Sequence, residues 1–224
     1  MKKRFVFAVV CVFFLLFTCI NAVAPFGEGQ KGVEVWQEEN VSPVAIKNYL
    51  DFETSSWARE YPPEFVMIHF MSAVSISQED PYNPELVREI FERDEIGINY
   101  IIHRDGTVEC YLPENRAAWY AGTGRITGDD KYTDKMNMYS IGIELVGMGS
   151  QEEMSQYIDA SEYESFGSDF YGFTDAQYDS LKILVEDICN RYFLPVDRNH
   201  ILGHDEYSED KVDPGELFDW SRIM

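Results

Sequence analysis

The sequence predicts one α/β domain in which a mixed central β-sheet is flanked by helices. Its 224 residues suit a single domain with a sizeable core. Aromatic residues are plentiful, with 15 Phe, 14 Tyr and 4 Trp, which indicates a folded globule. Short apolar runs of strand character also alternate with segments of helical periodicity, and this interleaving is typical of α/β folds.

Five apolar runs predict the strands of this sheet. The first follows two prolines, and the second and third are joined by Arg104-Asp105-Gly106, where the Asp-Gly pair predicts a hairpin. The fourth run carries one charge, Glu144, among Ile, Leu and Val. In chain order the runs are 65–70, 98–103, 107–112, 140–146 and 200–202.

Two segments predict helices. Residues 84–93 carry apolar side chains at helical spacing, with Asn83 as the N-cap. Thr174 caps a longer amphipathic helix that ends near Tyr192. Between the fourth strand and this helix, residues 147–172 are acidic and rich in Ser and Tyr, and we expect a surface excursion with a short helix.

The N-terminal residues predict an export signal followed by a lead-in. Residues 1–24 begin with three basic residues and continue in an apolar run of about 16, short of the roughly 20 that a spanning helix needs. They are expected to be a signal peptide or, with lipid attached at Cys19, a lipoprotein signal. The expected location is therefore periplasmic, extracellular or membrane-anchored. Residues 25–60 are expected to be irregular, with the catalytic domain at 61–224.

Charge and cysteine usage limit the partners. With 40 acidic and 18 basic residues, the formal charge is −22, which disfavours duplex nucleic acid and anionic lipid surfaces. Membrane contact is expected only through a lipid at Cys19, and the protein is expected to be a monomer. Outside the export segment lie Cys110 and Cys189, which fit either one disulfide or two buried thiols.

Candidate metal ligands come from the four histidines and one aspartate. His69 ends a buried apolar strand, where an imidazole needs a hydrogen bond or a metal. His204 follows a strand end, and Asp213 lies in a Pro- and Gly-marked turn. Two His and one carboxylate with an open fourth position form a common catalytic zinc set, although a lone His on an apolar strand is more often a hydrogen-bonded core residue. His200 is discounted as a partner of His204, and His103 is expected to be an exposed hairpin residue.

Glu144 and Lys211 are candidates for the reaction chemistry. A carboxylate in the strand at 140–146 is costly unless it is used or paired. Alternation along the strand offers a second interpretation, in which Glu144 faces solvent. Beside a metal, Glu144 would act as a general base. Lys211 is either a surface residue or a positive charge for the oxyanion that forms when water attacks a carbonyl.

Six motifs in order resemble the type 2 N-acetylmuramoyl-L-alanine amidase family, and within it the bacterial anhydromuropeptide amidases. The resemblance covers about 65–220 and implies a fold like that of peptidoglycan recognition proteins. It also implies that His69, His204 and Asp213 bind Zn²⁺, that Glu144 is the catalytic base and that Lys211 assists it. The motifs are 66–69, 104–108, 116–122, 140–147, 173–178 and 203–220.

Three positions depart from the family pattern on the expected substrate side. The usual Trp-His-Ala-Gly is here Trp119-Tyr120-Ala-Gly, and Asn99 stands where many members have His; where some relatives have a Tyr, the chain has Ile98. We therefore expect Asn99, Trp119 and Tyr120 to contact substrate.

The function implied by the resemblance is zinc-dependent hydrolysis of the amide between N-acetylmuramic acid and L-alanine, in peptidoglycan or in muropeptides released from it. Two alternatives remain at this point. Relatives without zinc bind peptidoglycan without cutting it, and a different zinc hydrolase would act within the stem peptide.

Overall fold

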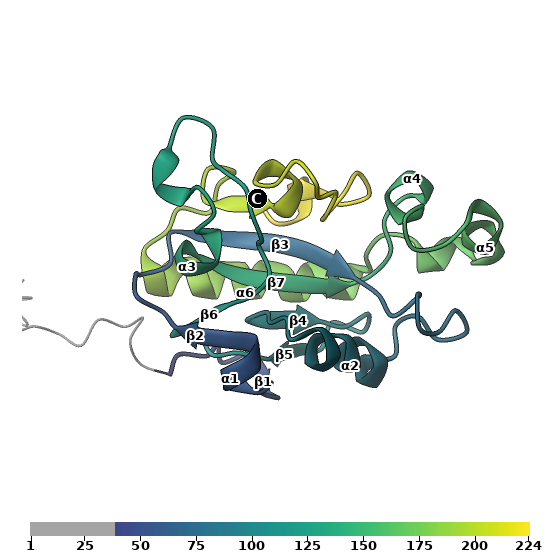
Figure 1. The fold of residues 1–224 in the computed structure, drawn as a ribbon, viewed down its shortest axis with the longest axis horizontal. Helices are drawn as coiled ribbons and strands as arrows, with labels where there is room; N and C mark the ends of the chain where they lie inside the picture. The colour runs from purple at the N-terminus through teal and green to yellow at the C-terminus, as the bar shows by residue number, and fades with distance from the viewer. Residues whose placement is uncertain (1–38) are drawn as a thin grey trace, which may run out of the picture. The chain divides into compact units, whose positions relative to one another are not determined.

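The computed structural model describes residues 39–224, and its centre is a six-stranded sheet in the order β1-β5-β4-β7-β3-β8 (Figure 1). Strands β4, β7, β3 and β8 run parallel, β5 is antiparallel to β4, and β1 is parallel to β5. The predicted mixed sheet is thus confirmed. The strands are β1 Ile46–Lys47, β3 Phe65–Met71, β4 Tyr100–Ile102, β5 Val108–Cys110, β7 Ser140–Val146 and β8 Ile201–Gly203.

The central pair, β3 and β7, is paired over its full length, from Phe65 opposite Ser140 to Met71 opposite Val146. Both strands are nearly continuous apolar runs, as expected for parallel strands that are covered on both faces. Side chains alternate between the faces, so the register places His69 directly beside Glu144 on the same face.

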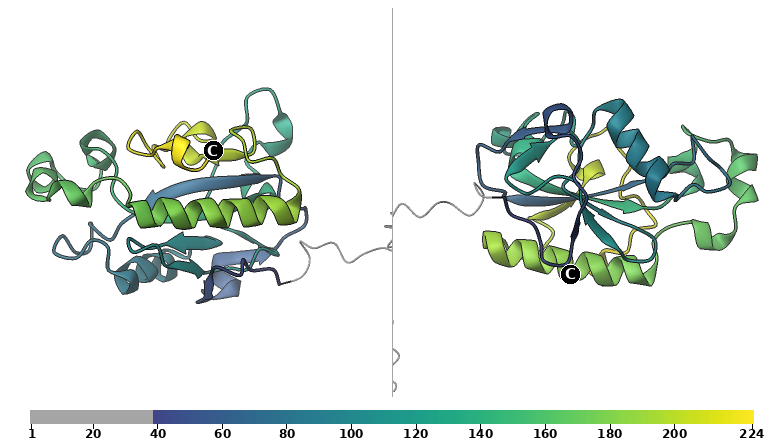
Figure 2. Two further views of the ribbon diagram at one scale, coloured as in Figure 1. Left: turned by 180° about the vertical axis from the view of Figure 1, so that it is seen from behind. Right: turned by 90° about the horizontal axis from the view of Figure 1, so that it is seen from below.

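Helices cover the two faces. Helix α6, Asp175–Tyr192, packs the stripe Leu181, Leu184 and Ile188 against one face, and Figure 2 shows it lying along the sheet. Helix α2, Pro84–Asp94, packs Val87 and Phe91 against the other face. The predicted caps are confirmed, since Thr174 Oγ1 accepts from Gln177 N and Asn83 Oδ1 accepts from Glu85 N. His69 and Glu144 share the face that α2 covers.

The segment expected to be irregular contains short regular elements in the part that the structure describes. Besides β1, it forms helix α1, Phe52–Ser55, and strand β2, Ser56–Ala58, which pairs with β6, Arg116–Ala118, in a second sheet. The buried guanidinium of Arg59 then donates to five backbone carbonyls. Elements of two to four residues are too short to show a periodicity in the sequence. Hydrogen bonds to distant parts of the chain stabilise them instead.

The acidic excursion forms two short helices rather than one. Helix α4 spans Gln151–Met154 and α5 spans Ala160–Ser165, followed by the 3-10 turn Ser168–Phe170. A further short helix, α3 at Met136–Tyr139, precedes β7. Figure 1 shows α4 and α5 beyond the end of β3 at which its arrow points.

The predicted export signal and Cys19 lie outside the described residues. Within 39–224, no helix has the length and apolar character needed to cross a bilayer. Cys110 and Cys189 are both buried free thiols, so of the two open interpretations the structure has the unpaired one.

Candidate metal centre and substrate cavity

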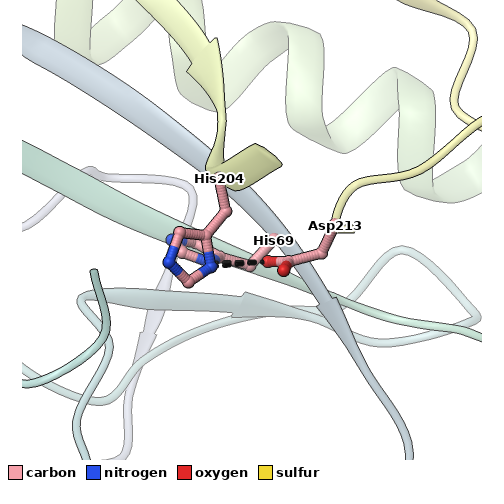
Figure 3. Close-up of side chains that lie close together, drawn as sticks. All are labelled: His69, His204 and Asp213. Carbon is pink, nitrogen blue, oxygen red and sulfur yellow. Dashed lines mark hydrogen bonds and ion pairs between the residues drawn. The ribbon is translucent and has the colours of Figure 1, made fainter. Parts of the chain in front are cut away.

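The three predicted ligands meet at one point. His69 comes from β3, His204 directly follows β8, and Asp213 lies on the loop beyond, as Figure 3 shows. The Nδ1 atoms of the two histidines are 3.1 Å apart. Asp213 Oδ2 is 2.8 Å from Nδ1 of His69 and 3.1 Å from Nδ1 of His204. Residues distant in sequence thus direct three donor atoms at a common centre.

This arrangement fits a metal ion. Ligand atoms around a tetrahedral zinc are about 3.4 Å apart, close to the distances seen here. His204 Nε2 lies 3.1 Å from the Ala121 carbonyl, which can only accept, so Nε2 carries the proton and Nδ1 keeps its lone pair. A hydrogen bond from the ring nitrogen that faces away from the metal fixes the tautomer that a metal ligand needs.

The charges also favour a cation. Burial, together with the neighbouring His204, lowers the pKa of His69 to about 4, so its ring is neutral at pH 7. Burial opposes ionisation of Asp213, but the close imidazoles of His204 and His69 outweigh it and lower its pKa. The centre therefore offers two imidazoles and one carboxylate, which is a donor set that binds divalent cations.

Glu144 is buried beside this centre, with 7% of its surface exposed. Its side chain makes no hydrogen bond to any residue in 39–224. Burial raises its pKa well above the ordinary value, as does the nearby Asp213, while Lys211 acts in the opposite direction. Alternation along β7 does hold, but the face toward which Glu144 points is covered rather than open to solvent. A high-pKa carboxylate next to a metal centre is typical of an acid–base catalyst.

A cavity of ≈ 320 Å³ borders the centre at Lys211 and Asp213. It lies between the end of β3, helix α2 and the α4–α5 segment. Lys211 is exposed, and its charge acts on Glu144. Apolar and polar side chains both line the cavity, as is common in ligand sites. They include Phe70, Met71, Val74, Ile90, Arg93, Met154, Gln156 and Tyr157.

Trp119 and Tyr120 lie at different depths. Trp119 is 49% exposed and its ring packs against Trp57, with the centroids 4.1 Å apart. Tyr120 lies edge-on to His69, at 5.3 Å between centroids, and its hydroxyl donates to the Ser140 carbonyl at 2.8 Å. Tyr120 therefore restrains the ring of a metal-ligand candidate. Substrate contact by either residue stays a prediction.

The expectation for Asn99 is wrong. Its side chain is fully buried, and its amide nitrogen donates to the carbonyls of Leu112, Pro113 and Arg116. Its amide oxygen accepts from Gly142 N at 3.1 Å. Asn99 joins β7 to the loop before β6 and is out of reach of a substrate. His103 is likewise buried rather than exposed, 3.2 Å from Glu109 through Nε2.

Asn99→Ala should therefore lower stability and leave ligand binding by the folded protein unchanged. The substitution leaves buried backbone groups without partners, which costs at least about 2 kcal/mol. Urea unfolding measures the loss, and Asn199→Ala, at an exposed position, is the matched control. A variant of unchanged stability would contradict the assignment.

Three residues that line the cavity were not predicted from the sequence, and they come from helix α2 and from the loop between α4 and α5. Arg93 lies in the last turn of α2, and Gln156 and Tyr157 lie between α4 and α5. The sequence signal for Gln156 and Tyr157 was the unusual Tyr content of the acidic excursion, which does not show where these side chains point, and Arg93 had no such signal. Residues that become neighbours only through packing cannot be identified from spacing.

Comparisons with known proteins identify the family. A family model described as N-acetylmuramoyl-L-alanine amidase matches residues 59–216. The chain belongs to this amidase family. Among solved structures, an AmpD selenomethionine derivative matches with a TM-score of 0.56 and 24% identity, covering 83% of this chain and 96% of that one. The Escherichia coli amidase AmiD, in complex with a substrate, matches at 0.51 and 22%, covering 75% and 59%. Both show the shared fold, and the expected peptidoglycan recognition protein-like architecture is confirmed.

Curated members of the amidase family are also similar in sequence. The 1,6-anhydro-N-acetylmuramyl-L-alanine amidase AmpD of Enterobacter cloacae is 35% identical over 124 residues, which is 55% of this chain and 52% of that protein. AmpD of Haemophilus influenzae is 32% identical over 146 residues, or 65% of each chain. The match thus spans between about half and two thirds of the length of these relatives.

These relatives contradict the predicted export. AmpD proteins are cytoplasmic anhydromuropeptide amidases. The prediction of a periplasmic, extracellular or lipid-anchored protein is therefore wrong. It rested on the composition of an apolar run after basic residues, and this run lies outside the described residues.

Proposed function

We propose that the protein is a zinc-dependent amidase that hydrolyses the bond between N-acetylmuramic acid and L-alanine in muropeptides. One observation carries the proposal: two histidines and an aspartate converge next to a buried glutamate, at the edge of a cavity. Membership of the amidase family and the names of the AmpD relatives support the reaction and the substrate class.

Zinc is the proposed metal, with His69, His204 and Asp213 as its ligands. Two imidazole nitrogens and one carboxylate oxygen are a donor set that zinc enzymes use, with the fourth position open. When bound, the ion supplies Lewis-acid chemistry, because it polarises a carbonyl and lowers the pKa of water. Tyr120 and the Ala121 carbonyl hold the two imidazoles in the orientation that binding requires.

The protein's own groups handle the proton and the charge. Glu144 accepts a proton from the attacking water and delivers it to the nitrogen of the leaving L-alanine. Lys211 places a positive charge where the carbonyl oxygen becomes negative, an interaction whose loss typically costs roughly 10²–10³ in rate. Its charge also favours the ionised form of Glu144, which is the form that accepts the proton.

Digestion of purified muropeptides followed by mass spectrometry tests the reaction. The proposal expects intact peptides beginning with L-alanine, together with the free sugar. Fragments cut within the stem peptide would instead identify a different hydrolase. Binding of muropeptides without any cleavage by the zinc-loaded protein would identify a recognition module.

Removal of one ligand should abolish metal binding. We expect His204→Ala to weaken zinc binding by more than about 100-fold. Changing a residue that only hydrogen-bonds to a metal ligand typically costs up to about 100-fold, and loss of the ligand itself should cost more. Elemental analysis after dialysis then finds roughly one zinc per chain in the parent protein and almost none in the variant. His200→Ala is the matched control, because His200 pairs with Asp197 outside the centre. Equal zinc content in all three proteins would contradict the ligand assignment.

A further inference from the structure

The segment between β7 and α6 reaches the cavity through one loop. Gln156 and Tyr157, between α4 and α5, line the same cavity as Lys211 and Asp213. Across the cavity lie the end of β3 and helix α2. The segment is therefore one wall of the proposed substrate site rather than a remote surface feature.

This wall is anchored to the body of the domain. The Glu153 carboxylate accepts from Ser150 N at 2.7 Å and from Glu216 N at 2.8 Å. Tyr163 donates to the Gly149 carbonyl at 2.9 Å. Beneath the loop, Met154 and Ile158 are buried in one apolar cluster with Val74 and Met148. Anchors on both sides of residues 154–158 hold the loop in a defined position before any ligand binds.

Tyr157 presents an unused hydrogen-bonding group at this wall. Its side chain is 56% exposed, and within 39–224 its hydroxyl makes no hydrogen bond. Tyr157 and Asp213 line the same cavity, and a phenol hydroxyl is a hydrogen-bond donor at neutral pH. An aromatic ring with a free donor, fixed beside reactive groups, is well suited to orient a ligand.

We propose that Tyr157 is a substrate-positioning residue, whose hydroxyl donates to an amide carbonyl or carboxylate oxygen of the muropeptide next to the bond that is cut. The inference rests on the proposed function and assigns a role to the acidic excursion. Because the proposed reaction assigns proton transfer to Glu144 and the developing charge to Lys211, Tyr157 acts on binding rather than on turnover. It therefore affects KM more than kcat.

Steady-state kinetics of the zinc-loaded protein with muramyl dipeptide test the proposal. Tyr157→Phe removes only the hydroxyl, and we expect KM to rise about 2–10-fold with kcat nearly unchanged. Tyr157→Ala also removes the ring and should raise KM further. The control is Tyr61→Phe, an exposed tyrosine that stacks on Tyr139. Wild-type KM in both Tyr157 variants would overturn the proposal, as would a fall in kcat at constant KM.

Two further measurements make the outcome unambiguous. Equal zinc content and melting temperature of Tyr157→Phe and the parent exclude a folding effect. Two substrates, one with a free and one with an amidated D-glutamate carboxylate, distinguish the acceptor. A rise in KM of Tyr157→Phe with the free acid alone identifies the carboxylate. An equal rise with both substrates identifies an amide carbonyl. Should the parent cleave neither muramyl dipeptide nor purified muropeptides, the proposed function fails. Calorimetric titration of parent and Tyr157→Phe then still tests Tyr157, since equal affinities overturn its role.

Discussion

Replacing Glu144 with glutamine should abolish amide hydrolysis while zinc remains bound. Glutamine has nearly the shape of the glutamate but cannot accept a proton at neutral pH, and general acid–base catalysis contributes typically 10²–10⁴ in rate. Mass-spectrometric assay of muropeptide cleavage measures the loss, and elemental analysis measures the zinc. Glu144→Ala should behave alike. Turnover near that of the parent in either variant would exclude Glu144 as the base.

The same substitution should stabilise the metal-free protein at neutral pH. The native pKa of Glu144 is raised above the ordinary 4.5, so ionisation favours the unfolded chain, and the cost grows as pH rises from 4.5 toward the native pKa. Below pH 4.5 the parent and Glu144→Gln should unfold at similar denaturant concentrations, and above it the variant should become progressively more stable. Glu89→Gln, at an exposed position of α2, is the control. A difference that does not depend on pH would contradict this account.

Replacing Glu114 with alanine should cost the protein at least about 3 kcal/mol, because several buried donors lose their acceptor at once and each such loss costs about 1–3 kcal/mol. Glu114 is fully buried at the turn before β6. Its carboxylate accepts from both terminal nitrogens of Arg191 and from the hydroxyls of Tyr100 and Tyr192, the last at 2.7 Å. It therefore links β4 to the end of α6.

Urea unfolding of Glu114→Ala measures that cost. The comparison is Glu92→Ala, whose ion pair with Arg88 is exposed and should contribute at most about 1 kcal/mol. Equal losses in the two variants would show that burial does not strengthen the interactions of Glu114.

Local patterns predicted the elements that carry the centre. The apolar runs at β3 and β7 and the capped helices α2 and α6 were recognisable because each has its own periodicity or cap. His69, His204, Asp213 and Glu144 were identified as chemical candidates from the elements and turns in which they lie. Resemblance to the family then selected these residues together with Lys211.

Other features could not be predicted because they depend on neighbours distant in sequence. Asn99 was assigned to the substrate side by analogy of position, yet it satisfies backbone groups of three segments. The residues around Glu114 in the sequence do not indicate its role. Its hydrogen-bond partners come from β4 and α6, which lie near it only in the folded chain. Tyr157 belongs to a segment whose acidic composition predicts only a solvated surface.

The register of the two central strands has a consequence for folding. His69 and Glu144 lie side by side on β3 and β7, and a slip of one residue would turn one of them toward the α6 face. In a misaligned pair, either His69 or Glu144 would therefore lie on the face of the metal centre, but not both. An ion that binds only the native arrangement stabilises that arrangement by mass action. Zinc would therefore favour the native register over the misaligned ones. Metal binding would then favour the native register of the two strands that carry the metal centre.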